Sequence, residues 1–234
     1  MLIPSQSWGE DVAVDSSLVK LNLESIKTNI AHCNVKIIAV TKYFGLKAIK
    51  AGYEAGIRDF AESRANEAIA KIEQLPQEVR ENSCFHFIGH LQSNKAEKVV
   101  KNFDYIHSVD SLKIATAISK AACSFNKKEK IFLQINNSGE EQKSGYTKEQ
   151  LRTDMKSILA LEGLEILGLM NMAPLGAAEG ELVRLFSDVR EFRNELEKSF
   201  QISLPELSMG MSDDYQVAIK CGATMVRIGR KLFT

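Results

Sequence analysis

Lys42 is the residue whose surroundings most clearly favour chemistry. It stands two positions after the apolar run Lys36–Val40, beside Thr41 and the aromatic Tyr43 and Phe44. Partial removal from water disfavours an ammonium ion, so an amine among apolar groups has a larger free-base fraction and can attack a carbonyl. Taken alone, Lys42 is better explained as an ordinary solvated loop lysine.

Two segments near the end of the sequence contain groups suited to an anion. They are Ser208-Met-Gly-Met-Ser212 and Met225-Val-Arg-Ile-Gly229, and a helical segment follows the first of them. Ser212 supplies a hydroxyl and a predicted N-cap, while Gly229 allows backbone amides to approach an anion closely. We expect the two aspartates after Ser212 to point away, because they would repel an anion. A capped helix and a glycine turn without a ligand is the simpler alternative.

Eight short apolar runs alternate with longer segments of 3.6-residue periodicity. This alternation is typical of parallel strands covered by helices. Eight repeats predict a single TIM-type (β/α)8 barrel domain over residues 1–234, with an N-terminal helix at about 15–33 in place of one after the last strand. An open doubly wound sheet is the competing architecture. The expected strands are Lys36–Val40, Asp59–Glu62, Phe85–Gly89, Tyr105–Val109, Ile131–Asn136, Glu165–Met172, Leu207–Gly210 and Met225–Gly229.

Several expected helices have recognisable start signals. Thr147 and Gln150 form a capping box, and Asp110 and Ser93 are predicted N-caps. The expected helices are Leu46–Ala55, Arg64–Leu75, Ser93–Phe103, Leu112–Phe125, Thr147–Leu161, Glu181–Phe200 and Asp213–Cys221.

Closure of the barrel would bring both ends of the chain together. Its first and last strands are neighbours, so Lys42 and Arg227 would flank one mouth with Ser212 and Gly229 beside them. A reactive amine, an anion cradle and a fixed cation suit a phosphorylated aldehyde.

Composition excludes several other classes of protein. Lysine plus arginine and aspartate plus glutamate both number 30, so the net charge is zero and neither nucleic acid nor an anionic membrane is an expected partner. Met1–Asp11 has no basic leader, and no apolar stretch is long enough for a membrane helix. The four scattered cysteines indicate no zinc site, so we expect a reduced, cytoplasmic protein without a metal.

The sequence resembles the pyridoxal phosphate homeostasis proteins, the YggS-like family, over nearly its whole length. Seven ordered motifs carry the resemblance. They are Ile38-Ala-Val-Thr-Lys42, Phe85-His-Phe-Ile-Gly-His-Leu-Gln-Ser-Asn-Lys95, Ser108-Val-Asp-Ser111, Asn137-Ser-Gly-Glu140 with Lys143-Ser-Gly145, Gly168-Leu-Met-Asn-Met-Ala-Pro174, Leu207-Ser-Met-Gly-Met-Ser212 and Val226-Arg-Ile-Gly229.

The resemblance implies a fold type III barrel like the N-terminal domain of alanine racemase. It implies pyridoxal 5'-phosphate (PLP) as an internal aldimine on Lys42, with phosphate contacts from Ser212, Gly229 and the Arg230 backbone amide. It also implies that Arg227 faces the pyridine nitrogen. An arginine stays protonated and donates, so that nitrogen remains unprotonated and the ring becomes a poorer electron sink.

Two segments depart from the family pattern. After the second expected strand the sequence reads Phe60-Ala-Glu-Ser-Arg64, where family members usually read Phe-Gly-Glu-Asn-Tyr, so Ala61, Ser63 and Arg64 differ. Ser63 replaces an asparagine that lies near the cofactor in the family, so Ser63 is a weaker candidate for cofactor contact. Gly45 replaces the customary proline after the lysine. We expect binding to persist, with an altered affinity.

The same resemblance favours a cofactor carrier over an enzyme. Racemases of this fold need an acid or base opposite the lysine, from an extra C-terminal domain, and only Arg230-Lys-Leu-Phe-Thr234 follows Gly229. His90 is better explained as a loop anchor and Tyr43 as a packing residue, so we expect no catalytic residue. PLP-dependent apoenzymes are the expected recipients, and a monomer is expected. A weakly active amino-acid racemase or decarboxylase remains an alternative, and a Schiff-base aldolase is disfavoured by Arg227.

Overall fold

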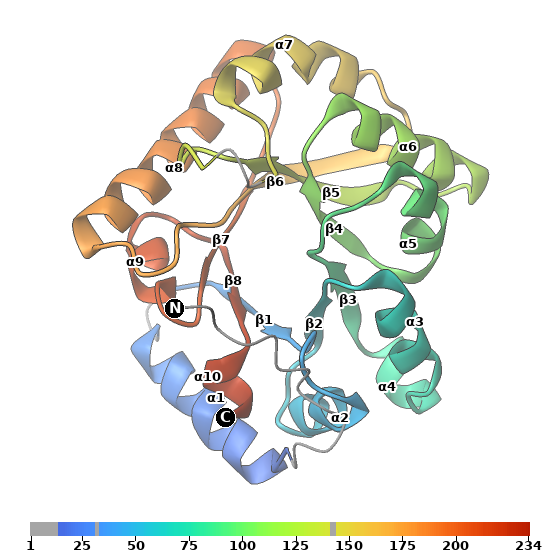
Figure 1. Ribbon diagram of the computed structural model, residues 1–234, viewed down its shortest axis with the longest axis vertical. Helices are drawn as coiled ribbons and strands as arrows, with labels where there is room; N and C mark the ends of the chain where they lie inside the picture. Colours follow the sequence, from blue (N-terminus) through green and yellow to red (C-terminus); the bar gives the residue numbers. More distant parts are fainter. Residues whose placement is uncertain (1–13, 31–32, 141–143) are drawn as a thin grey trace.

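The protein is a closed barrel of parallel strands surrounded by helices (Figure 1). The computed structural model describes residues 14–30, 33–140 and 144–234. Because β1 pairs with β8, the predicted barrel is confirmed and the open doubly wound sheet is wrong. The strands are β1 (Lys36–Val40), β2 (Asp59–Glu62), β3 (Cys84–Phe87), β4 (Tyr105–Val109), β5 (Glu129–Ile135), β6 (Leu164–Asn171), β7 (Glu206–Met211) and β8 (Met225–Ile228).

Some sequence-based predictions lie outside the described residues. They concern the absence of a leader at Met1–Asp11, positions 31–32 of the expected first helix, and Lys143 in one of the family motifs.

The helices lie on the outside of the barrel and follow the strands in turn. Helix α4 was not predicted, because five residues are too few to show a helical period. The helices are α1 (Ser16–Asn29), α2 (Leu46–Glu54), α3 (Ala65–Glu73), α4 (Gln77–Glu81), α5 (Ala96–Asn102) after the 3-10 turn η1 (Ser93–Lys95), α6 (Leu112–Ser124), α7 (Lys148–Leu159), α8 (Glu179–Phe200), α9 (Tyr215–Lys220) and α10 (Arg230–Phe233).

The helix starts agree with the predictions in part. The capping box of Thr147 and Gln150 at α7 is confirmed. Helix α6 is capped by Ser111, whose hydroxyl accepts from the Ile114 N–H, and not by Asp110. Ser93 begins the 3-10 turn η1 rather than capping an α-helix.

The first helix lies next to the place after the last strand, but it does not replace a helix there as predicted, because the four-residue α10 follows β8. The first helix ends at Asn29, four residues before the predicted end, where the Ile30 N–H donates to the carbonyls of Lys27 and Thr28. Helix α1 lies beside the short α10 (Figure 1), and the Asn22 side chain donates to the Leu232 carbonyl at 3.2 Å. The N- and C-terminal ends of the described chain therefore close one side of the barrel together.

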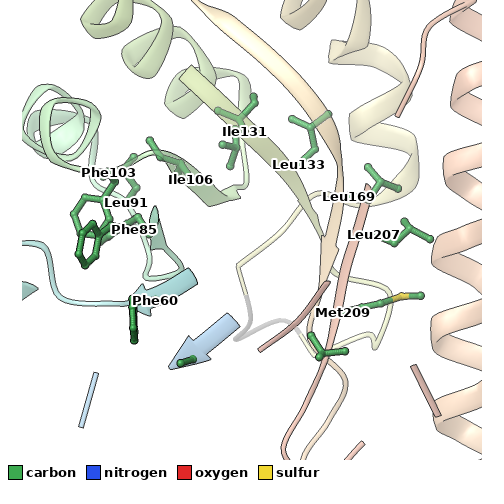
Figure 2. Close-up of a cluster of buried hydrophobic side chains, with 14 of the residues drawn as sticks. Phe60, Phe85, Leu91, Phe103, Ile106, Ile131, Leu133, Leu169, Leu207 and Met209 are labelled. Carbon is green, nitrogen blue, oxygen red and sulfur yellow. The ribbon is translucent and has the colours of Figure 1, made fainter. Parts of the chain in front are cut away.

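Apolar side chains form two separate layers. The outer layer fills the space between strands and helices, where Phe60, Ile106 and Leu207 are fully buried (Figure 2). The inner layer lies inside the barrel and consists of Ile38, Ala61, Phe132, Met170 and Met225.

Side-chain alternation decides which strand residues face the barrel interior. Successive residues of a strand point to opposite faces. On β1, Ile38 belongs to the inner layer and Val40 packs against it, whereas Ala39 belongs to the outer layer. Lys42 follows Val40 by two positions, at the carboxyl end of the strand where barrel enzymes build their sites.

Candidate functional site

The predicted site residues gather at the carboxyl ends of β1, β7 and β8. Ile38 is paired with Arg227 across the β1–β8 ladder, which places Lys42 at the rim above Arg227. Ser212 directly follows β7, and Gly229 directly follows β8. The closure of the barrel therefore brings residues 42 and 227 onto neighbouring strands, as predicted.

Arg227 is a buried cation held by three hydrogen bonds. Its side chain points into the barrel and the residue is 3% exposed. Nη1 donates to the carbonyl and hydroxyl oxygens of Ser208, both at 2.7 Å, and Nη2 donates to the Asn171 carbonyl at 2.8 Å. Burial lowers the pKa of Arg227 to about 10, partly offset by the charge of Asp214, so the guanidinium is protonated at neutral pH.

Three of the five guanidinium N–H groups are used in these bonds. Within the described part of the chain, Nε and the second Nη2 proton have no hydrogen-bond acceptor. These two N–H groups are available to a ligand acceptor.

Ser212 and Gly229 are in contact, but Ser212 is not a helix cap. Helix α9 begins at Tyr215, two residues later than the predicted Asp213, so Ser212 lies in the preceding turn. The Ser212 hydroxyl instead accepts from the Gly229 N–H at 3.3 Å, which leaves its own proton available to an anion. A Cβ at Gly229 would lie 3.4 Å from the Val40 carbonyl oxygen, which places this turn against the end of β1.

The two aspartates after Ser212 behave differently. Asp213 is exposed and pairs with the Arg230 guanidinium at 3.0 Å. Asp214 is buried, and its carboxylate accepts from the Met211 N–H at 2.5 Å, so it closes its own turn. Burial raises the pKa of Asp214, against the opposing effects of that backbone bond and of Arg227. Of the two, only Asp213 points outward as predicted. The Arg230 side chain pairs with Asp213 and is also exposed.

Lys42 is half-buried, and its ammonium group lies over the ring of Tyr43. The distance from Nζ to the ring centroid is 4.9 Å. Tyr43 is 49% exposed, so the prediction that it is a packing residue is wrong. Its ring instead forms a partly solvated platform for the amine, where a cation–π contact contributes about 0.5–1 kcal/mol.

A buried ion pair that the sequence did not reveal anchors the Lys42 loop. The Lys71 ammonium donates to Glu62 at 2.9 Å and to the carbonyls of Thr41 and Phe44 at 3.1 and 2.7 Å. The Thr41 hydroxyl donates to the same Glu62 oxygen at 2.8 Å. Burial raises the pKa of Glu62, although Lys71 and Thr41 act in the opposite direction. Residues on either side of Lys42 are thus tied to β2 and α3.

Ser63 lies at the neighbouring strand end, where the ladder pairs Val40 with Ala61. It is half-buried and packs against Gly89, at which a Cβ would come within 1.9 Å of the Ser63 carbonyl oxygen. The next residue, Arg64, is exposed and pairs with Glu67. Of Ser63 and Arg64, only Ser63 packs at the barrel rim beside the Lys42 loop. Gly45 lies in that loop, as the N-cap of α2.

His90 is a loop residue with two polar neighbours. Its Nδ1 is 3.3 Å from the Asp110 carboxylate and 3.2 Å from the Ser144 hydroxyl. The side chain is 62% exposed, which agrees with the predicted loop-anchoring role.

Asn171, at the end of β6, was also missed by the sequence reasoning. Its amide donates to the Ile135 carbonyl and to Asn137, while its side-chain oxygen is buried and has no partner within the described residues. The family motif contained this residue, but its role depends on closeness to Arg227, which only the fold reveals.

Comparison with known proteins identifies the family. The model of the "Alanine racemase, N-terminal domain" family matches residues 14–234. A pyridoxal phosphate homeostasis protein of Synechocystis sp. is 48% identical over 200 residues, which cover 86% of this chain and 91% of the relative. A second such protein, from Aquifex aeolicus, is 36% identical over 85% of this chain and 86% of its own length.

This chain belongs to the pyridoxal phosphate homeostasis protein family. The predicted membership is confirmed. A solved structure of another member, PipY of Synechococcus elongatus, described as having PLP bound, has a TM-score of 0.84 and 38% identity over 92% of this chain and all of that chain. Alanine racemase of Clostridium difficile, at 19% identity and a TM-score of 0.73, shares the fold.

Two further features are absent from the part of the chain that the structure describes. None of their helices is long and apolar enough to cross a membrane. They also include no group of three or more His, Cys, Asp or Glu side chains placed to hold a metal ion.

Proposed function

We propose that this protein binds PLP at the barrel mouth, holds it covalently through Lys42, and serves PLP homeostasis as a carrier without strong catalysis. Bound PLP supplies an aldehyde that condenses with an amine and a ring that accepts electrons. The proposal is supported by family membership and by the PLP described for PipY. In this proposal the barrel and its N-terminal helix form one binding domain.

The residues present fit this cofactor. The unused donors of Arg227 suit the pyridine nitrogen, and the free proton of the Ser212 hydroxyl suits a phosphate oxygen. The backbone amide of Arg230 lies at the start of α10, where N–H groups favour an anion, and Gly229, whose own N–H donates to the Ser212 hydroxyl, lets the backbone approach a phosphate closely. Ser63 and the unpartnered side-chain oxygen of Asn171 are further candidates for polar contact.

Arg227 is the single observation that carries the carrier assignment. A buried, protonated guanidinium donates a hydrogen bond and does not deliver its proton, so the ring nitrogen facing it stays neutral. A neutral pyridine withdraws electrons weakly, which disfavours the carbanions of amino-acid chemistry. The residues of this site therefore bind the cofactor while giving it little catalytic power.

The direct test is the location of the covalent bond. Protein incubated with PLP and reduced with borohydride is expected to show one pyridoxyl adduct, at Lys42, by peptide mass spectrometry. Lys42→Ala is expected to lose both the adduct and the visible absorption band. Its unfolding free energy is expected to stay within about 1 kcal/mol of the wild type, because the half-buried side chain contributes only its contact with Tyr43. Lys47→Ala, an exposed lysine on α2, is the matched control and keeps the band.

The enzyme alternative gives a different result. Steady turnover of an amino acid by the loaded protein, abolished by Lys42→Ala, would replace the carrier assignment with a racemase or decarboxylase. An adduct with a sugar phosphate and none with PLP would indicate an aldolase. Recipient apoenzymes and a monomeric state belong to the same proposal; the first is checked by cofactor transfer to an apoenzyme and the second by light scattering.

A further inference from the structure

A row of polar side chains, most of them buried, crosses the interior of the barrel. It begins at Arg227 near the proposed cofactor site and ends near the opposite mouth, where Lys36 and Asp59 line a hollow of about 400 Å³. Its six members come from six different strands. In order they are Arg227, Ser208, His107, His86, Asp59 and Lys36.

Every neighbouring pair in this row is within hydrogen-bond distance. Arg227 Nη1 lies 2.7 Å from the Ser208 hydroxyl, which lies 2.9 Å from His107 Nδ1. His107 Nε2 is 2.9 Å from His86 Nδ1, and His86 Nε2 is 3.0 Å from the Asp59 carboxylate. The same carboxylate oxygen lies 3.2 Å from the Lys36 ammonium.

The first donor leaves one consistent direction open for the others. Arginine can only donate, so the Ser208 hydroxyl accepts from Arg227. Its own proton can then point to His107 Nδ1, its other side-chain partner among the described residues. His107 then carries its proton on Nε2 and donates to His86 Nδ1. His86 in turn carries its proton on Nε2 and donates to Asp59.

The last acceptor requires the same direction. Partial burial alone would raise the pKa of Asp59, but the hydrogen bond from His86 and the charge of Lys36 outweigh it and lower that pKa, so Asp59 is ionised and acts as an acceptor. Burial lowers the pKa of His86 and places that of His107 well below its ordinary value. Both rings are fully buried, and the charges facing His107 from β8 and β1, on Arg227 and Lys36, oppose its protonation. Two neutral histidines with Nε2 protons satisfy every bond.

We propose that Ser208, His107 and His86 are positioning residues that hold the Arg227 guanidinium in place as the hydrogen-bond donor to the cofactor ring. This inference rests on the proposed function and extends it to the opposite end of the barrel. The arginine side chain has several rotatable bonds, and carbonyls alone leave it free to tilt. A hydroxyl that accepts from Arg227 and donates to His107 fixes one edge of the guanidinium and cannot turn to donate to the ring itself.

The first experiment measures the proton positions without any cofactor. Histidine-selective ¹⁵N labelling and long-range ¹H–¹⁵N correlation of the protein free of PLP are expected to show His86 and His107 as neutral Nε2–H tautomers at pH 7. His90, which is exposed, serves as the internal reference. A protonated ring or an Nδ1–H tautomer at either buried histidine would overturn the proposed direction of the hydrogen bonds along the row.

The second experiment tests the connection to the cofactor. Ser208→Ala removes the hydroxyl but keeps the carbonyl bond to Arg227. The variant is expected to retain the Lys42 adduct, to bind PLP about tenfold more weakly, and to shift the visible band or the pH at which it titrates, because one of the bonds that hold the guanidinium is lost.

Ser119→Ala is the matched control. Ser119 is also buried, and its hydroxyl accepts from the Gly163 N–H at 3.1 Å. This hydrogen bond lies outside the barrel and does not involve any member of the row. It is expected to lose similar stability with an unchanged spectrum. A Ser208→Ala spectrum identical to the wild type, or the same shift in Ser119→Ala, would overturn the positioning role. If wild-type Lys42 forms no adduct at all, the proposed function fails. The tautomer measurement still shows whether the row of hydrogen bonds from Arg227 to Asp59 exists.

Discussion

The Arg227 side and the Lys42 side of the barrel mouth are built in opposite ways. Arg227 is almost fully buried, makes three hydrogen bonds, and is connected through Ser208 and His107 to the far end of the barrel. Lys42 is half-buried, and the structure shows its amine against the Tyr43 ring alone among the described residues. The backbone around Lys42 is anchored, but its side chain is not.

In the proposed function this difference corresponds to two different tasks. A donor that faces a cofactor ring works best when it is preorganised, because its orientation is then not lost at each binding event. An amine that forms and breaks a covalent bond must move between its free and bound positions. A carrier needs both features in one pocket: fixed recognition of the ring and reversible attachment of the aldehyde.

Removal of Arg227 is expected to have the largest effect on stability. Arg227→Ala leaves a cavity and deprives the Ser208 and Asn171 oxygens of their donor, so the unfolding free energy is expected to fall by about 3–5 kcal/mol. Arg64→Ala, which breaks only an exposed pair with Glu67, is expected to change it by less than about 1 kcal/mol. Urea unfolding of both variants measures the difference. Equal losses of unfolding free energy in the two variants would contradict the contrast between a fixed Arg227 side and an adaptable Lys42 side.

Loss of Lys71 is the next largest expected change, and it tests the anchoring of the Lys42 loop. Lys71→Met leaves Glu62, which is 1% exposed, without its counter-charge and is expected to cost about 3 kcal/mol. The Lys71→Met/Glu62→Gln double variant removes the unpaired charge and is expected to recover part of that loss. Chemical denaturation measures the stabilities, and borohydride trapping measures adduct formation at Lys42. Full stability with normal trapping would show that the loop is held in another way.

The smallest expected effect is a pH dependence that originates in the histidine pair. The folded-state pKa values of His86 and His107 lie below the ordinary 6.5, so the unfolded chain binds more protons as the pH falls. Their contribution to stability is complete above pH 6.5 and is lost below it, by up to about 1.4 kcal/mol per pH unit for each histidine. His107→Phe is expected to reduce this slope between pH 6.5 and 5.

Because Glu129 also contributes to the pH dependence, the effect of His107→Phe must be evaluated as the difference between the wild type and the variant. Burial raises the pKa of Glu129 to about 7, so its contribution falls as the pH rises from 4.5 and opposes that of the histidines. Because Glu129 is present in both proteins, subtracting the His107→Phe values from the wild-type values isolates the histidine. An unchanged slope would mean that His107 is already protonated in the folded state.

Local sequence determined the elements of the barrel and their order. Continuous apolar runs are sufficient to locate buried parallel strands, and β1, β2 and β4 have the predicted bounds. Side-chain and backbone groups a few residues apart determine helix starts such as the Thr147 capping box. Where neighbouring cap candidates compete, as Asp110 and Ser111 do, or where a turn closes on itself before a helix, as at Ser212, local preference was not enough.

Tertiary structure alone decided how the site is supported. The motifs located Lys42, Ser212, Arg227 and Gly229, but the partners of Arg227 lie on other strands. Ser208 and His107 are 101 positions apart, and His86 and His107 are 21 apart. Their hydrogen bonds depend on which strand residues point inward and on the register between strands, and both are settled only when the barrel closes. The chemistry of the site is therefore readable in the sequence, whereas its rigidity is a property of the fold.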